Sequence, residues 1–98
     1  MFLHLGKNVI INLEDVIAII DLPSVAGSSD TGDFIRTARE EGFVITITGE
    51  KPKSMIITEK AGGRNNKKGT GNSSVYFSPI SSSTLSRRAG FLHNISEL

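Results

Sequence analysis

The chain has 98 residues, a formal net charge of +1 and no cysteine, so we expect one domain without disulfide bonds, thiolate metal sites or a cysteine nucleophile. No apolar run approaches the roughly 20 residues that span a bilayer, and the N-terminus lacks the pattern of a signal peptide, so a cytoplasmic protein is expected. His4 and His93 stand alone without further ligands at metal spacing, and we therefore expect no metal and no cofactor.

The first half of the chain predicts three strands and a helix. The strands are expected at residues 2–5, 9–11 and 16–22, where apolar runs are bounded by turn residues. Residues 6–8 are typical of a tight turn, and Asn12 is expected to cap one helical turn. The third strand is so continuously apolar that we expect both of its faces to be covered. A helix is expected to run from a cap at Asp30 or Thr31 to Glu41.

The second half predicts three further strands and a second helix. The strands are expected at residues 43–48, 54–58 and 75–77. Residues 49–53, with Pro52, are expected to form a hairpin turn between the first two of them. Residues 61–74 contain no apolar side chain larger than alanine, so we expect a flexible insertion rich in Gly, Lys and Asn. One of the serines at 81–83 is expected to cap a helix whose apolar stripe begins at Leu85.

The resulting order, βββαβββα, predicts a small single α+β domain over residues 1–98. Its sheet is expected to be antiparallel or mixed and to contain about six short strands, with two helices packed against it.

No catalytic site is expected. Lys68 precedes Gly69 and Thr70, whereas a phosphate-binding loop needs its lysine after the last glycine. The serines at 81–83 lack the Gly-x-Ser-x-Gly context of a nucleophile. We therefore predict a protein that is not an enzyme and takes no small-molecule substrate.

The charges are divided unevenly between the two halves. Residues 1–50 carry three basic and eight acidic side chains, whereas residues 51–98 carry eight basic and two acidic ones. A basic surface suits a polyanion, because phosphates that are neutralised release their counterions. The alternative is that folding mixes the charges into an ordinary solvated surface.

The basic side chains of the second half are the candidate DNA-binding residues. Lys51 and Lys53 are expected to project from the tip of a hairpin, and Arg87 and Arg88 are expected early in the C-terminal helix, where guanidinium groups can grip phosphates. The expected insertion adds Arg64, Lys67 and Lys68. Few aromatic side chains are present to stack on bases, so the backbone of double-stranded DNA is the favoured partner.

Four segments of the chain carry a family resemblance. They are residues 4–6 (HLG), 14–21 (EDVIAIID), 52–58 (PKSMIIT) and 78–85 (SPISSSTL). In this combination they resemble the RemA/RemB-like family of bacterial extracellular matrix regulators. The resemblance implies a nucleoid-associated transcription regulator of biofilm matrix genes that forms a ring-shaped homo-oligomer, with a fold similar to LytTR-type DNA-binding domains. It also implies that Lys51 and Lys53 contact DNA.

The chain departs from its apparent relatives in charge. RemA-like members carry an Arg-Arg pair where this chain has Glu50 and Lys51, and an arginine where it has Glu14 and Asp15. The insertion at 61–74 has no counterpart, and its cations are expected to compensate. The alternative function is a protein–protein assembly module that does not bind DNA directly.

Overall fold

A computed structural model describes residues 1–60 and 73–90, and residues 61–72 and 91–98 lie outside the described part of the chain. The elements are β1 (Phe2–Gly6), β2 (Val9–Asn12), η1 (Leu13–Asp15), β3 (Val16–Asp21), η2 (Pro23–Val25), α1 (Ser29–Glu40), β4 (Val44–Thr46), β5 (Ser54–Glu59), β6 (Ser73–Ser78) and α2 (Ser82–Ala89). Apart from the two short 3-10 helices, η1 and η2, this is the expected order βββαβββα, and the α+β class is confirmed.

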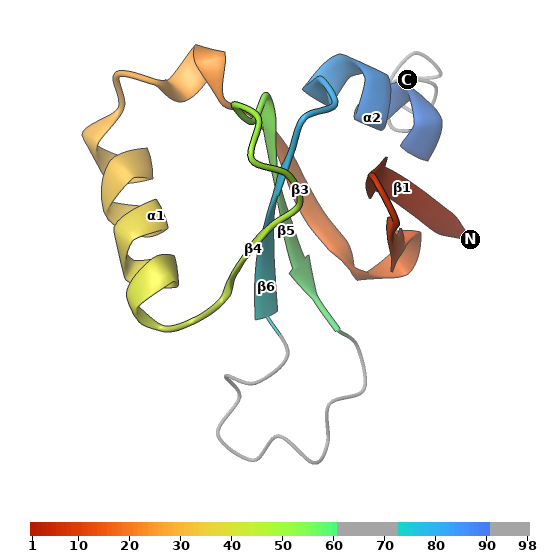
Figure 1. Ribbon diagram of the computed structural model, residues 1–98, viewed down its shortest axis with the longest axis horizontal. Coiled ribbons are helices and arrows are strands. Elements are labelled where there is room, and N and C mark those ends of the chain that lie inside the picture. Colours follow the sequence, from red (N-terminus) through yellow and green to blue (C-terminus); the bar gives the residue numbers. More distant parts are fainter. Residues whose placement is uncertain (61–72, 91–98) are drawn as a thin grey trace, which may run out of the picture.

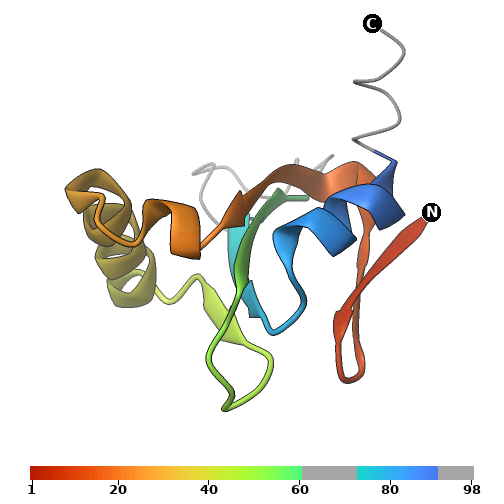
Figure 2. The same ribbon diagram turned by 90° about the horizontal axis from the view of Figure 1, so that it is seen from above.

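The strands form two sheets that pack in three layers with the helices. A four-stranded sheet has the order β3-β5-β6-β4, and β1 and β2 form a separate hairpin. In the larger sheet β4 runs parallel to β6 and the other pairs are antiparallel, so the predicted mixed sheet is confirmed. Helix α1 covers one face of this sheet, and the hairpin and α2 cover the other (Figures 1 and 2).

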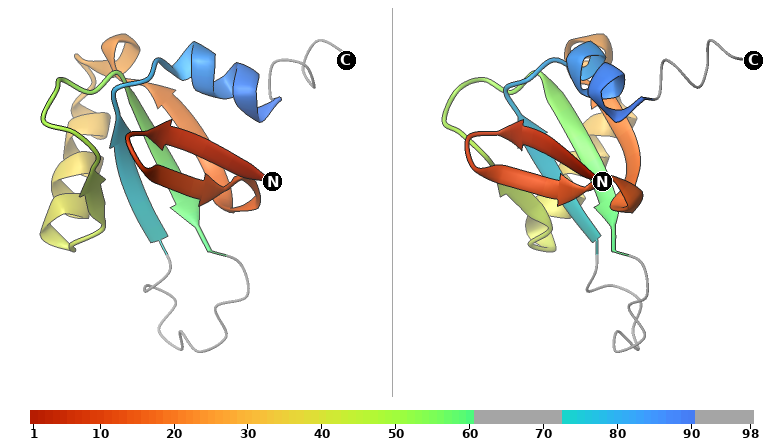
Figure 3. Two further views of the ribbon diagram at one scale, coloured as in Figure 1. Left: turned by 45° about the vertical axis from the view of Figure 1, so that its right-hand side comes forward. Right: turned by 90° about the vertical axis from the view of Figure 1, so that its right-hand side faces the viewer.

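The two faces of the sheet carry separate cores because successive side chains of a strand point to opposite sides. Met55 of β5 packs with Ala38 of α1, whereas its neighbour Ile56 packs with Leu85 of α2. The core under the hairpin also contains Leu3, Leu5 and Ile11. Figure 3 shows the hairpin lying across the face of the sheet beside α2.

The expectation that both faces of the third strand are covered is wrong for Ile17, whose exposed fraction is 59%. β3 is an edge strand of the sheet. Its pairing with β5 shifts register between Val16 and Ala18, which places Ile17 in a bulge, where a side chain leaves the regular alternation. A run of apolar residues predicts a strand, but it does not show whether that strand lies at the edge or in the middle of the sheet.

The helix caps agree with the sequence in one case and differ in the other. Ser81 caps α2, as expected for one of the serines at 81–83, by accepting a hydrogen bond from the backbone N–H of Thr84 at 3.2 Å. The cap of α1 is Ser28, which accepts from the N–H of Thr31 at 3.2 Å. Asp30 and Thr31 therefore lie inside the first turn. All four consecutive residues from 28 to 31 are of types that cap helices, and the local sequence does not choose among them.

The predicted hairpin between the fourth and fifth strands does not form. β4 and β5 lie on opposite sides of β6, so the connecting residues 47–53, which we call the crossover loop, pass over the end of β6. The N–H of Lys53 donates to the carbonyl of Ser78 at 2.8 Å, and the N–H of Ile47 donates to that of Phe77 at 3.4 Å. The flanking sequence identifies both strands, but it does not show that a third strand lies between them.

Buried serines join the hairpin to the sheet. The Ser78 hydroxyl donates to the carbonyl of Leu5 in β1 at 2.6 Å and accepts from the N–H of Ile80 at 3.0 Å. The Ser54 hydroxyl donates to the carbonyl of Ile80 at 2.8 Å. Both serine residues have an exposed fraction of 0%, so these bonds form where water cannot replace them. Ser73 and Ser74, which were expected in the insertion, belong to β6.

Gly6 ends β1 in a conformation and a space that suit only glycine. Its φ is +124°, and a Cβ placed there would lie 3.2 Å from Cδ of Pro79. We expect Gly6→Ala to lower the free energy of unfolding by more than about 1 kcal/mol, because a side chain meets both strain and a close contact. In contrast, Gly32 lies in α1 with open space around it, so Gly32→Ala is expected to stabilise by about 0.5–1 kcal/mol. Thermal unfolding of both variants tests this, and equal effects would contradict it.

Asp21 ties the end of β3 to α2. Its carboxylate accepts from the hydroxyl and the N–H of Ser24 and from the hydroxyl of Ser82 at 3.0 Å. These bonds, the one from the Ser24 hydroxyl foremost, hold the pKa of Asp21 below its ordinary value of 3.8. A lowered folded-state pKa gives stability that is present above the unfolded-state pKa and is lost as the pH falls through the folded-state value.

The Asp21→Asn variant is therefore expected to lower the urea midpoint of unfolding at neutral pH. At an acidic pH below the folded-state pKa of Asp21, the difference from the unmodified protein is expected to shrink, because the carboxyl of Asp21 is then uncharged. Urea unfolding at both pH values measures this. A difference that is the same at both pH values would show that the charge of Asp21 is not what matters.

Candidate nucleic-acid interface

Three connections meet at one end of the four-stranded sheet. They are the hairpin turn (residues 6–8), the crossover loop (47–53) and the link from β6 to α2 (79–81), and together we call them the loop end. A Cβ placed on Gly6 would lie 3.2 Å from Pro79 and 3.6 Å from Cγ2 of Ile47, so the three connections are in direct contact. Figure 2 shows the hairpin turn and the crossover loop projecting on the same side of the molecule.

The loop end carries exposed lysines from both halves of the chain. Lys51 and Lys53 are exposed in the crossover loop, as the sequence predicted, although the loop is not a hairpin. Lys7 is exposed in the hairpin turn with a φ of +49° and joins them. Lys7 is not among the residues predicted from the sequence, because it lies in the acidic half and its only signal is its place in a tight turn. Glu50, also exposed, offsets one of the three positive charges.

The structure does not place Arg87 and Arg88 early in α2. They are exposed and occupy its last turn, and Gly90 ends the helix with a φ of +83°. α2 starts beside the loop end and runs away from it (Figure 2), so the two arginines lie at its far end. Cations in the last turn also complement the negative end of the helix dipole, which gives their position a structural reason.

The remaining candidates, Arg64, Lys67 and Lys68, lie outside the described residues. The chain leaves β5 after Glu59 and enters β6 at Ser73. Because β5 begins at the loop end with Ser54, both of these attachment points are at the opposite end of the sheet. The described structure therefore does not group these three cations with Lys51 and Lys53.

Each of the two arginines of α1 contacts another side chain of the fold. Arg36 forms an exposed ion pair with Asp33 at 2.9 Å. The guanidinium carbon of Arg39 lies 5.2 Å from the centre of the Phe77 ring, a cation–π distance. The same helix region carries exposed Asp30, Glu40 and Glu41. The layer formed by α1 is thus rich in carboxylates, and of the basic side chains of the first half only Lys7 lies at the loop end.

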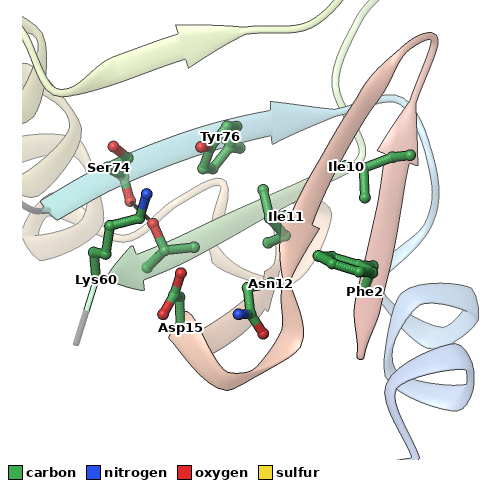
Figure 4. Close-up of a pocket in the computed structure, with 9 residues that line it drawn as sticks. Phe2, Ile10, Ile11, Asn12, Asp15, Lys60, Ser74 and Tyr76 are labelled. Carbon is green, nitrogen blue, oxygen red and sulfur yellow. Dashed lines mark hydrogen bonds between the residues drawn. The ribbon is translucent and has the colours of Figure 1, made fainter. Parts of the chain in front are cut away.

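A groove of about 590 Å³ opens at the end of the sheet away from the loop end. The hairpin and η1 form one wall, and the ends of β5 and β6 form the floor (Figure 4). The lining residues are Phe2, Ile10, Ile11, Asn12, Asp15, Thr58, Lys60, Ser74 and Tyr76. With one carboxylate and one ammonium, the formal charges of the groove cancel, whereas the loop end carries an excess of positive charge.

The described residues contain no group of three His, Asp or Glu side chains that could hold a metal ion. Within the same ranges, neither helix is long and apolar enough to cross a membrane.

Comparison with known proteins gives two matches. A family model described as RemA-like, extracellular matrix regulatory protein A-like, matches residues 2–89. Over 95 residues the chain is 27% identical to extracellular matrix regulatory protein B of Bacillus subtilis (strain 168), an alignment that covers 97% of this chain and 98% of that protein. Both matches extend over the loop end and the groove.

Proposed function

This chain belongs to the RemA-like family of extracellular matrix regulatory proteins, and on that premise we propose that it regulates extracellular matrix genes by binding double-stranded DNA. The loop end is the contact surface, the acting form is a homo-oligomeric ring, and no catalysis is involved. Such a regulator works at the nucleoid in the cytoplasm. The observation that supports this proposal best is the convergence of Lys7, Lys51 and Lys53 on one end of the sheet.

The chemistry of the loop end suits a phosphate backbone. Lysine is a compact charge on a flexible stem, so turns that project can bring its ammonium group to a phosphate without precise geometry. No aromatic side chain occurs at residues 6–8, 47–53 or 79–81, and stacking on unpaired bases needs such side chains. The loop end is therefore better matched to duplex DNA than to a single strand.

Charge arithmetic favours an oligomer. Three phosphate contacts give a slope of log K against log salt of only about −2.7, since each contact contributes about −0.9. A single subunit would thus bind weakly at physiological salt. When several subunits present the same loop end, each bound site raises the effective concentration for the next. Among the described strands, β3 and β4 are the two edges of the four-stranded sheet, and they offer backbone groups through which subunits can pair.

The same edges support a second candidate function. Ile17 on β3 and Ile45 on β4 have exposed fractions of 59% and 39%, and exposed apolar edge strands are typical binding sites for another chain. In this alternative the protein is an assembly module that regulates through protein contacts, and the lysines of the loop end keep it in solution.

One experiment separates the two candidates. The mass of the purified protein in solution is measured first, and the assembled form is then titrated with duplex DNA at several salt concentrations. We expect a large closed oligomer that binds several unrelated duplexes and loses affinity steeply as salt rises. An oligomer with no salt-sensitive DNA binding would support the assembly module instead.

A further inference from the structure

The outer face of the hairpin carries two large apolar side chains that nothing covers in the described structure, opposite the polar residues Asn12 and His4. Phe2 and Ile10 have exposed fractions of 73% and 60%, and they project over the groove (Figure 4). The inner face of the same hairpin buries Leu3 and Ile11 in the core. A two-stranded hairpin with apolar residues on both faces loses favourable burial on the outer one unless another segment covers it.

The polar residues of the groove limit what can cover it. Asp15 repels a polyanion, and Lys60 offers a partner for a single carboxylate. An occupant that covers Phe2 and Ile10 must therefore present apolar side chains to the hairpin and carry little net charge. Residues 61–72 do not qualify, because their sequence, AGGRNNKKGTGN, has no apolar side chain larger than alanine.

Residues 91–98 fit both requirements. Their sequence is FLHNISEL, in which Phe91, Leu92, Ile95 and Leu98 are large apolar residues and Glu97 is the only acidic one. We propose that residues 91–98 bind in the groove of their own chain, with their apolar side chains against Phe2 and Ile10.

The position of the last described residues brings this segment within reach. Ala89 packs against the core that contains Leu3, and Phe2 adjoins Leu3 on the opposite face of β1. Among the described strands β1 pairs only with β2, so its outer edge is open. Eight extended residues span about 26 Å. Packed layers lie about 10 Å apart. Residues 91–98 are therefore long enough to pass around β1 and still lie along the groove.

Hydrogen exchange measured by mass spectrometry tests the proposal on the full chain without DNA. Amides of residues 91–98 are expected to exchange at least tenfold more slowly than in a free peptide of the same sequence. The variant with both Phe2→Ser and Ile10→Ser is expected to lose this protection. Ile45→Ser, a similar change on the distant edge strand β4, should leave it intact. Exchange of residues 91–98 at the peptide rate in the unmodified protein would overturn the proposal.

A second double variant controls for the case in which the serine substitutions at Phe2 and Ile10 disturb the hairpin itself. Changing Ile95 and Leu98 to serine alters no described residue, and it should abolish the same protection. The two double variants are then mixed, so that one supplies an intact groove and the other an intact segment. If mixing restores protection, the segment binds a neighbouring copy and the assignment to its own chain is wrong. If protection stays absent in the mixture, the intramolecular contact stands.

Discussion

Replacing Lys51 and Lys53 together with alanine is expected to weaken duplex binding at least tenfold at physiological salt and to do so equally for unrelated sequences. Both side chains are exposed in the crossover loop, and each phosphate contact that is lost flattens the slope of log K against log salt by about 0.9 per subunit. Binding curves for two different duplexes, recorded at four or more salt concentrations, give both quantities.

Lys7→Ala supplies an independent test of the same surface. Lys7 lies about fifty residues away in sequence from Lys53 but shares the loop end with it, so its removal should also flatten the salt slope. Lys60→Ala is the matched control, because it removes an exposed lysine at the other end of the sheet. If Lys60→Ala weakens binding as much as Lys7→Ala does, the loop end is not the interface.

The Ser78→Ala variant is expected to lower the free energy of unfolding by about 2–3 kcal/mol. The Ser78 hydroxyl satisfies the carbonyl of Leu5 and the N–H of Ile80, and leaving buried polar groups unpaired costs about 1–3 kcal/mol. Because one of these partners belongs to β1, the loss should loosen the hairpin from the sheet. Urea unfolding at neutral pH measures the change.

Ser29→Ala is the control for this prediction, since Ser29 is exposed at the start of α1. Exposed substitutions of this kind usually change stability by less than about 0.5 kcal/mol. The slope of unfolding free energy against urea should stay the same in both variants if the unfolded states are alike. Equal costs for the two variants would mean that the Ser78 bonds do not hold the hairpin.

Local features of the chain were readable from the sequence. The turn at residues 6–8, a serine cap within residues 81–83 and a helix that ends near Glu41, just before Gly42 with its φ of +81°, all depend on residue types that favour one backbone conformation over a few positions. The segment 78–85, one of the four that carried the family resemblance, contains the buried Ser78 and the capping Ser81. These two hydroxyls give part of that motif a structural reason.

Only part of the candidate site could be predicted from the sequence. Lys51 and Lys53 were identified because they flank a proline between two strand patterns, and this local pattern survives even though the strands are not neighbours. Lys7 was missed, because its place beside the crossover loop follows from the packing of Gly6 against Pro79. The position of Arg87 and Arg88 was misjudged because the end of α2 is set by Gly90 only a few residues beyond.

The sequence by itself determined the α+β class, the order of the elements and the family, because these depend on residue patterns over short stretches. The tertiary structure decided that β6 lies between β4 and β5, that β3 is an edge strand and that the first two strands leave the main sheet as a hairpin. Strand neighbours are chosen by packing between residues far apart in the chain. The same packing brings a lysine of the acidic half to the end of the sheet that carries Lys51 and Lys53.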